Sequence, residues 1–449
     1  MSNKPSSALG ASMKDQLIQQ ARERRLRGAT GEAPAPSLQS VQQAAAAVPE
    51  QFYRFDQHPG YQQLQVMLQS ASRMGLANPF FKLHENLAEA QTTIGGECYI
   101  NYASYNYLGY SGHPQVAEAA KQAIDRYGTS VSASRAVSGE RPLHRELEQE
   151  LAAVYDVEDA VTFVSGHATN VTSIGYLFGP RDLIVHDELI HNSVLQGIQL
   201  SGARRLSFAH NDWQALDRLL GEQRQHFERV LVVLEGIYSM DGDYPDLPRF
   251  VELRNRHRVF LMVDEAHSLG VMGATGKGIR EHFGLAGSDV DIWMGTLSKT
   301  LSSCGGYIAG AKALVENLRF LAPGFLYSVG MPPPVAAAAL AALRCMQQEP
   351  QRVATVQARG EQFLRLAREA GLDVATSTGL AVIPVITGSS LKATLLSGAL
   401  FRRGINAQPI LYPAVPEKAA RVRFFVSCLH SEAQIAETVA IVAQELALL

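Results

Sequence analysis

Lys299 and Asp264 are the two residues whose types and surroundings most directly indicate chemistry. Lys299 is flanked by hydroxyl-bearing residues, and Asp264 comes directly after the apolar, strand-like run 259–263. An amine can form a Schiff base with an aldehyde, and a carboxylate can hold a pyridine nitrogen protonated so that the ring accepts electrons. The two residues therefore supply the groups that a cofactor with an aldehyde and a pyridine ring requires.

The segment Asp264-Glu265-Ala266-His267 has a second interpretation, because it also resembles the metal-binding box of DEAH-type helicases. That interpretation requires an upstream G-x-x-x-x-G-K-[ST] loop to hold phosphates. The chain has no such loop, and the glycine-rich stretch 273–278 lies downstream with the wrong spacing. The sequence therefore disfavours a helicase.

Two groups of residues could hold a phosphate. Ser165, Gly166 and His167 follow a strand-like run and open a helix, where backbone N–H groups favour an anion. Such a junction is by itself more often a simple turn. Thr296 and Ser298 lie just before Lys299 in the sequence and would add hydroxyl donors to the same phosphate.

His191 follows the apolar run 183–185, where an imidazole could stack on a cofactor ring. A lone histidine at a helix start is usually an ordinary polar or capping residue, so its local signal is weak. In open α/β sheets, ligands bind beyond the carboxyl ends of strands, and Asp264 falls at such an end.

The elements around these residues indicate an α/β fold. Apolar residues recur at helical spacing in 114–126 and 142–155. Short apolar runs lie at 160–164, 183–185, 230–234, 259–263 and 290–294. Such runs alternating with helices are typical of a mostly parallel sheet covered on both faces.

The alternation breaks at three prolines, 332–334, and a smaller α+β domain is expected after them. We expect a mobile N-terminal extension and linker at 1–50, an N-terminal segment at 51–105, a large cofactor-binding domain at 106–331 and a small C-terminal domain at 332–449. Within the extension, 14–27 could form a short helix with a basic end.

The composition fits a soluble globular enzyme. Of the 449 residues, 46% are apolar, and the formal charge is -3, which gives no sign of a nucleic-acid or membrane partner. No apolar run reaches membrane-spanning length. The four cysteines are scattered without C-x-x-C spacing, so we expect no zinc site, no disulfide framework and a cytoplasmic location.

Six segments occur in an order that is typical of one family. They lie at 106–109, 235–243, 264–267, 296–306, 327–332 and 421–423. Together they resemble the α-oxoamine synthases, which use pyridoxal phosphate on fold type I and include serine palmitoyltransferase-like and 8-amino-7-oxononanoate synthase-like members. The resemblance runs over residues 102–449.

The resemblance implies contacts for each part of the cofactor ring. Lys299 would be the Schiff-base lysine, Asp264 the partner of the ring nitrogen, and His267 the donor near the phenolic oxygen. His191 matches the stacking histidine, and Ser239 matches a serine near the ring oxygen. His167 departs from the family, which usually has Phe or Tyr after Ser-Gly.

Further roles concern the substrate and a second subunit. Family members are dimers, so Ser328 would reach the phosphate in the neighbouring subunit. Arg423 matches the arginine that holds the amino-acid carboxylate, although the residues alone would favour a surface ion pair. Tyr105 and Asn106 would lie at the substrate, and Tyr105 stands where many glycine-using members have Asn. We therefore expect an amino acid with a side chain, serine or alanine.

The implied reaction is a decarboxylative Claisen condensation of an amino acid with an acyl thioester, giving an α-aminoketone, carbon dioxide and a free thiol. An aminotransferase or lyase of the same fold stays open, as does a catalytically inactive partner subunit, which would be expected to lack Lys299. The lead-in 52–81 resembles that of synthases attached to polyketide-type assembly lines, and the basic stretch 22–27 could steer an acidic carrier by charge. We therefore expect an acyl carrier protein as donor, with coenzyme A thioesters poorer.

Overall fold

The computed structural model describes residues 48–449. The chain divides into two units, Met1–Gly75 and Leu76–Leu449. Within the described part of the first unit, η1 (Glu50–Phe52), η2 (Phe55–Gln57) and α3 (Pro59–Arg73) contain no buried residue. The extension and basic helix predicted before residue 48 lie outside the described residues.

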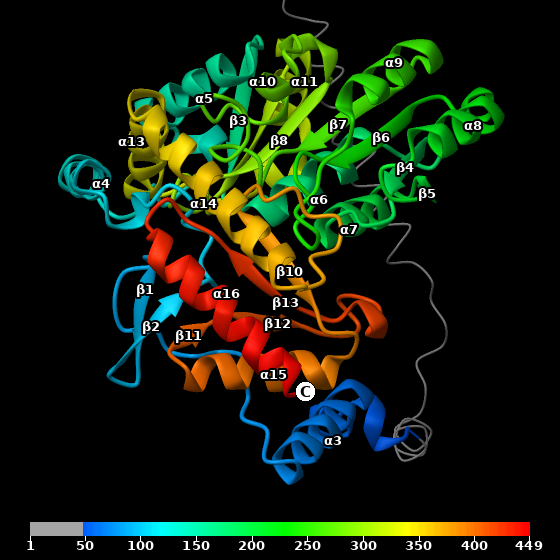
Figure 1. Cartoon of the computed structure of the whole chain (residues 1–449). Helices are drawn as coiled ribbons and strands as arrows, with labels where there is room; N and C mark the ends of the chain where they lie inside the picture. The colour runs from blue at the N-terminus through cyan, green and yellow to red at the C-terminus, as the bar shows by residue number, and fades with distance from the viewer. Residues whose placement is uncertain (1–47) are drawn as a thin grey trace, which may run out of the picture. The chain divides into compact units, whose positions relative to one another are not determined.

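A seven-stranded sheet forms the centre of the second unit (Figure 1). Its strand order is β3-β9-β8-β7-β6-β4-β5. The strands are β3 (Asp159–Phe163), β4 (Leu183–Asp187), β5 (Arg204–Phe208), β6 (Val230–Glu235), β7 (Phe260–Asp264), β8 (Ile292–Thr296) and β9 (Gly306–Gly310). Only β9 runs antiparallel to its neighbours within this sheet, so the predicted mostly parallel sheet is confirmed.

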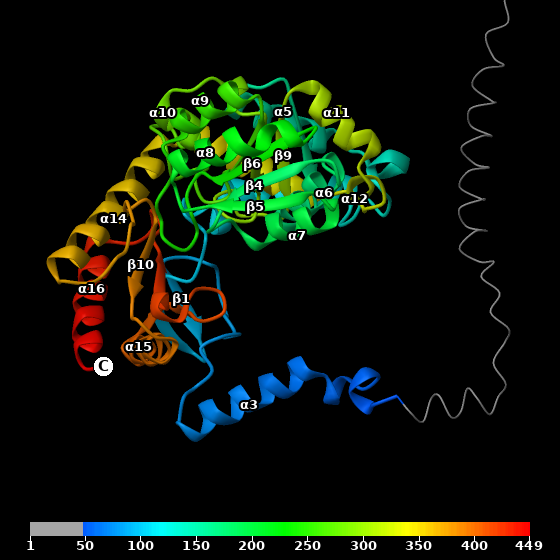
Figure 2. The same cartoon turned by 90° about the vertical axis from the view of Figure 1, so that its right-hand side faces the viewer.

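Helices cover both faces of this sheet (Figures 1 and 2). On β6, Val232 and Leu234 point into one apolar core and Leu231 and Val233 into another, as the two-residue period of a strand requires. The first core includes residues of α4 (Pro114–Tyr127), α5 (Pro142–Tyr155), α9 (Leu247–His257) and α13 (Pro333–Gln348). The second core includes residues of α6 (Gly166–Leu177), α7 (Asn192–Ser201) and α11 (Lys312–Leu321).

A smaller α+β part follows in the sequence. Its sheet has the antiparallel order β10-β13-β12, formed by β10 (Val382–Ile386), β13 (Arg421–Phe425) and β12 (Gln408–Ile410). The helices are α14 (Pro350–Glu369), α15 (Ser390–Arg402) and α16 (Glu432–Ala447), of which α14 and α16 lie side by side (Figure 2). A second small sheet joins β1 (Gln91–Ile94) and β2 (Glu97–Asn101) to β11 (Ile405–Asn406).

The apolar cores bear on where the domains meet. Tyr102 lies in the core of the smaller part, beside Phe363 and Phe424, although it precedes the large sheet in sequence. Leu340 and Leu343 of α13 lie in the core of the large sheet, although they follow the three prolines. The domain boundaries at 106 and 332 stay predictions.

Both predicted helices are present, as Pro114–Tyr127 and Pro142–Tyr155. All five predicted strands are present too, but β8 begins two residues later than the run 290–294 predicts. The reason is Asp291, whose carboxylate binds Arg254 at 2.6 Å and accepts a hydrogen bond from the Leu261 backbone at 2.8 Å. In residues 48–449, no helix is long and apolar enough to cross a membrane.

Candidate active site

The predicted site residues gather at one edge of the large sheet. Asp264 ends β7, Thr296 ends β8, and Glu235 ends β6, which lies between β7 and β4. Because the carboxyl ends of parallel strands meet at the same edge, these three side chains share it. The sheet therefore positions a carboxylate, a hydroxyl and a second carboxyl group together.

Asp264 is buried and fully hydrogen-bonded. Its Oδ2 accepts from Nδ2 of Asn170 at 3.0 Å, and its Oδ1 accepts from the Ala266 backbone N–H at 3.0 Å. Asn170 also donates to Ser193 Oγ at 2.9 Å, so α6 and α7 both hold the carboxylate in place. The sequence motif contained Asn170 but gave no sign of this contact, which joins residues far apart in the chain.

His267 is held as a neutral ring. Burial, reinforced by the positive charges of Lys299 and Arg423, keeps the pKa of His267 well below its usual range. Its Nδ1 lies 2.7 Å from the hydroxyl of Tyr107. Burial raises the pKa of Tyr107, so its hydroxyl stays protonated and donates a hydrogen bond to Nδ1, which leaves the ring proton of His267 on Nε2. His267 can therefore donate a hydrogen bond from Nε2.

Lys299 opens into a cavity of about 380 Å³. Tyr105 and Asn106 also line this cavity, together with Ser298 and Ser302. Burial lowers the pKa of Lys299 to about 8, although the negative charge of Asp264 opposes the shift. A lysine with such a pKa is partly unprotonated near neutral pH and can act as a nucleophile or base.

The predicted phosphate residues lie together. Ser165 caps α6, accepting from the Ala168 N–H at 3.4 Å, and Gly166 and His167 form the first turn. A side chain on Gly166 would collide with Thr296, whose Oγ1 would lie 2.8 Å from its Cβ, so the missing side chain lets the start of α6 pack closely against the end of β8. Thr296 Oγ1 lies 2.8 Å from Ser298 Oγ. Backbone donors and hydroxyls thus face one place at a helix N-terminus.

His191 is the N-cap of α7. Its Nδ1 accepts from the Ser193 backbone N–H at 3.2 Å and lies 2.7 Å from Ser193 Oγ. The structure therefore has the capping role considered from the sequence. Capping fixes the orientation of the ring, and the stacking role stays a prediction. Ser193 in turn contacts Asn170, which connects His191 to the Asp264 hydrogen bonds.

Arg423 approaches from β13 of the smaller part. Its Nη1 donates to the backbone carbonyl of Ser239 at 2.7 Å, while its Nε is buried without a partner among the described residues. Its guanidinium lies 4.4 Å from the Phe425 ring centroid. No carboxylate pairs with Arg423 in residues 48–449, so the surface ion pair considered from the sequence is not what the structure has.

Tyr105, Asn106 and Ser328 were also predicted for the site, and each lies in different surroundings. The Tyr105 ring lies 5.5 Å from Lys299 Nζ and contacts Phe425 edge-on at 4.6 Å. Asn106 binds the structure itself, donating to the Ala88 carbonyl at 2.7 Å and accepting from Ser302 Oγ at 2.8 Å. Ser328 does not line the Lys299 cavity of its own chain.

Glu235 was quoted in a sequence motif but given no role. It is buried opposite Asp264 in the β6–β7 register. Burial and the Asp264 charge raise the pKa of Glu235 to about 8. Its Oε2 accepts from the Ser239 N–H at 3.3 Å, and its Oε1 has no hydrogen-bond partner among the described residues. The sequence signal that could have found it is its place at the end of an apolar strand.

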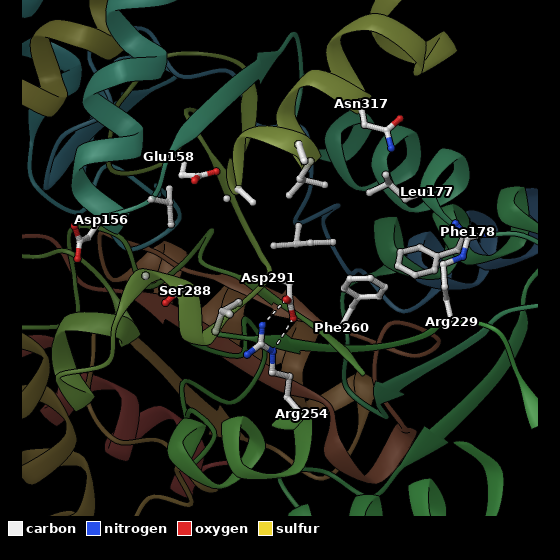
Figure 3. Close-up of a pocket in the computed structure, with 18 residues that line it drawn as sticks. Asp156, Glu158, Leu177, Phe178, Arg229, Arg254, Phe260, Ser288, Asp291 and Asn317 are labelled. Carbon is white, nitrogen blue, oxygen red and sulfur yellow. Dashed lines mark hydrogen bonds and ion pairs between the residues drawn. The ribbon is translucent and has the colours of Figure 1, made fainter. Parts of the chain in front are cut away.

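A larger cavity of about 790 Å³ lies at the opposite, amino edge of the sheet (Figure 3). Phe178 and Phe260 meet there at 6.2 Å, and Arg254 pairs with Asp291 at its rim. It shares no residue with the Lys299 cavity, so it has no part in the chemistry described above.

Comparisons with known proteins identify the family. The sequence pattern of the family described as aminotransferase class I and II matches residues 97–442. The chain belongs to this family. An 8-amino-7-oxononanoate synthase of Symbiobacterium thermophilum is 39% identical over 373 residues, which cover 83% of this chain and 94% of that protein. One of Cellvibrio japonicus is 40% identical over 356 residues, covering 79% and 89%.

Solved structures show the same fold. Serine palmitoyltransferase of Sphingomonas wittichii superposes with a TM-score of 0.82 at 28% identity, covering 86% of this chain and 97% of that one. A structure of SPT with a PLP internal aldimine gives a TM-score of 0.82 at 27% identity, with coverage of 86% and 97%. The predicted α-oxoamine synthase family, its fold type and its pyridoxal phosphate cofactor are thereby confirmed.

Proposed function

We propose that this chain is a pyridoxal phosphate-dependent acyltransferase that condenses an amino acid with an acyl thioester, releasing carbon dioxide and a free thiol. The observation that carries the proposal is Lys299, whose amine has a pKa of about 8. It lies among Asp264, His267 and Arg423, which are the groups needed for a ring nitrogen, a phenolic oxygen and a carboxylate.

The described residues fit the cofactor. Close packing at Gly166 brings the N–H groups at the start of α6 near Thr296, whose hydroxyl lies 2.8 Å from that of Ser298, and this combination suits a phosphate. Asp264 would hold the ring nitrogen protonated, and His267 Nε2 would donate to the phenolic oxygen. His191 would stack on the ring. The cofactor, when bound, supplies an electron sink for charge that develops at the amino-acid α-carbon.

The chain's own residues then perform the remaining steps. Arg423 binds the amino-acid carboxylate, a task for which its unpaired Nε and planar fork are suited. The Lys299 amine removes the α-proton. The α-carbon forms a bond to the acyl carbon, and the thiolate leaves and takes up a proton. The amino-acid carboxylate departs as carbon dioxide, and Lys299 returns a proton to the α-carbon.

A coupled assay of thiol and carbon dioxide release tests this function. Both products should appear in equal amounts, and only when amino acid and thioester are present together. An aminotransferase would release neither, and a lyase would not release thiol and carbon dioxide together. A catalytically inactive partner subunit would show no turnover alone, but the presence of both Lys299 and Asp264 argues against it.

The amino acid is proposed to be serine or alanine, because Tyr105 brings a phenolic ring into the cavity beside Lys299. Titration of the cofactor absorbance with each amino acid tests this. A change with glycine alone would refute the role given to Tyr105.

The acyl donor is proposed to be carried on an acyl carrier protein. Residues 1–75 contain eight Lys or Arg and five Asp or Glu, a net charge of +3, whereas the whole chain carries -3. A basic segment on an otherwise acidic chain could steer an acidic carrier, mainly through the association rate. Comparing kcat/KM for one acyl chain on a carrier protein and on coenzyme A decides the point. Equal or better use of coenzyme A would reject it, and deletion of residues 1–30 then tests the basic segment separately.

A homodimer in the cytoplasm is the proposed state. Val137 is 82% exposed and Tyr327 87% exposed, and Val329, Phe320 and Leu321 are exposed too. The Gly330 N–H donates to the Ala133 carbonyl at 3.0 Å, so two of these apolar segments are fixed side by side. Apolar surface of this kind favours a partner, and a second copy would bring Ser328 towards its neighbour's phosphate site. Analytical ultracentrifugation of Tyr327→Glu against the unaltered protein tests the dimer.

A further inference from the structure

Glu235 is the buried titratable group that the reaction above leaves without a task. It is 3% exposed, and β6 places it directly opposite Asp264 of β7. Asp264 has a donor for each of its oxygens, whereas Glu235 has one donor, Ser239 N–H, and a buried Oε1 that meets none in residues 48–449. Buried polar atoms normally have partners, so this exception calls for a physical account.

A short chain of contacts leads from Glu235 to the substrate arginine. The Glu235 carboxyl accepts from the backbone N–H of Ser239, and the backbone carbonyl of Ser239 accepts from Arg423 Nη1 at 2.7 Å. Glu235 and Arg423 thus bind the backbone of the same residue, Glu235 at its N–H group and Arg423 at its carbonyl group. Glu235 belongs to the large sheet and Arg423 to the smaller part, so the segment at Ser239 connects the two.

We propose that Glu235 is held as an uncharged carboxylic acid and acts as a positioning residue, fixing the Ser239 segment so that Arg423 stays free for a substrate carboxylate. The inference rests on the function proposed above and adds a residue to the site. A neutral acid keeps the hydrogen bond to Ser239 but does not compete with the substrate for Arg423. It also adds no second negative charge beside Asp264.

The groups around Glu235 favour its neutral form. Burial and the Asp264 carboxylate raise its pKa to about 8, while Lys299 and the Ser239 backbone N–H oppose the shift. Arg423 donates to the Ser239 carbonyl, not to Glu235 itself. Glu235 is therefore neutral below about pH 8 and ionises as the pH rises through that value.

Infrared spectroscopy of the protein without cofactor tests the protonation state independently of turnover. A protonated-carboxyl band should disappear as pH rises through about 8, and it should be absent from Glu235→Gln. Glu265→Gln is the matched control, because Glu265 is another buried acid, with a pKa of about 7, that binds the Ile279 N–H rather than Ser239. The control should keep the band that titrates near pH 8.

Amino-acid binding to the loaded enzyme tests the positioning role. In unaltered protein, the dissociation constant seen by cofactor absorbance should rise several-fold above about pH 8, and Glu235→Gln should remove this rise. The two proteins are compared at each pH, so that the effects of other groups titrating in this range cancel. Glu235→Ala should weaken binding and raise KM about 10-fold or more, with a smaller change in kcat, and Glu235→Gln should restore it.

Two outcomes would overturn the proposal. One is a Glu235 that is already ionised at about pH 6 by infrared spectroscopy. The other is a Glu235→Gln protein whose binding keeps the same pH dependence as the unaltered protein. If Glu235→Ala fails to fold, the infrared result and the Gln variant still decide. A protein that binds amino acids but never condenses them would refute the proposed function and leave these two measurements intact.

Discussion

Replacing Asp264 by asparagine removes a charge with almost no change in size. In the unaltered protein, Asn170 donates to Oδ2 and the Ala266 N–H donates to Oδ1, each at 3.0 Å. An asparagine side chain has only one acceptor group, so in either orientation its NH2 faces one of these two donors. The variant therefore loses one hydrogen bond in addition to the charge.

The two losses have different magnitudes and different readouts. A buried donor left without an acceptor costs about 1–3 kcal/mol of folding free energy, which thermal unfolding measures. Losing the carboxylate that keeps the pyridine nitrogen protonated should slow turnover on the order of 1,000-fold, or about 4 kcal/mol of barrier. Because Asp264 raises the pKa values of Lys299 and Glu235, both pKa values should fall in the variant.

A double variant separates the hydrogen bond from the charge. Asp264→Asn with Asn170→Asp again places an acceptor opposite an amide, so much of the lost stability should return. The charge now lies on α6 rather than at the end of β7, so turnover should stay low. Asp159→Asn is the control for loss of a buried aspartate elsewhere, since Asp159 pairs with Arg145 at 2.5 Å. Near-normal turnover by Asp264→Asn would refute the proposed role of the charge.

Three other perturbations follow from the same geometry. Lys299→Ala should abolish turnover and the lysine label left by borohydride reduction, and a label on another lysine would show that the wrong amine was chosen. In protein without cofactor, an amine reagent should modify Lys299 with an apparent pKa near 8, and Lys299→Ala should lose that modification. Because folding lowers this pKa from 10.5, the contribution of Lys299 to stability should increase as pH rises between the two values. Gly242→Ala should destabilise the protein by about 2–4 kcal/mol in denaturant unfolding, because Gly242 has φ of +72° and a Cβ would collide with the Val382 carbonyl; an unchanged midpoint would contradict this.

The sequence predicted the elements with strong periodicity and missed those without it. The helix at Pro142–Tyr155 repeats apolar residues at three and four, and its boundaries were predicted to the residue. The strands β5 and β9 were not predicted. β5 is an edge strand with two arginines, and the apolar run of β9 is only three residues long between two glycines, so neither has the longer apolar run that marks a buried strand.

The candidate site was predictable where one residue's own surroundings indicate its task. Asp264 follows an apolar run, and the segment at Lys299 is rich in hydroxyls. Asn170 and Tyr107 were not given a task, because each acts on a partner far away in sequence: 94 residues separate Asn170 from Asp264, and 160 separate Tyr107 from His267. Pairings of that kind depend on which strands become neighbours, and local patterns do not contain this information.

The strand register explains why the two carboxyl groups of the site must differ in charge. In parallel strands β6 and β7, Glu235 pairs with Asp264, so both side chains point to the same face at the same edge. Two carboxylates this close in a buried site cannot both ionise easily. Asp264 has donors on both oxygens and Glu235 on only one, so the hydrogen bonds favour the negative charge on Asp264. A pyridine nitrogen needs its counterion at Asp264, and an arginine that binds a substrate carboxylate needs no competing anion nearby. The same asymmetry meets both needs.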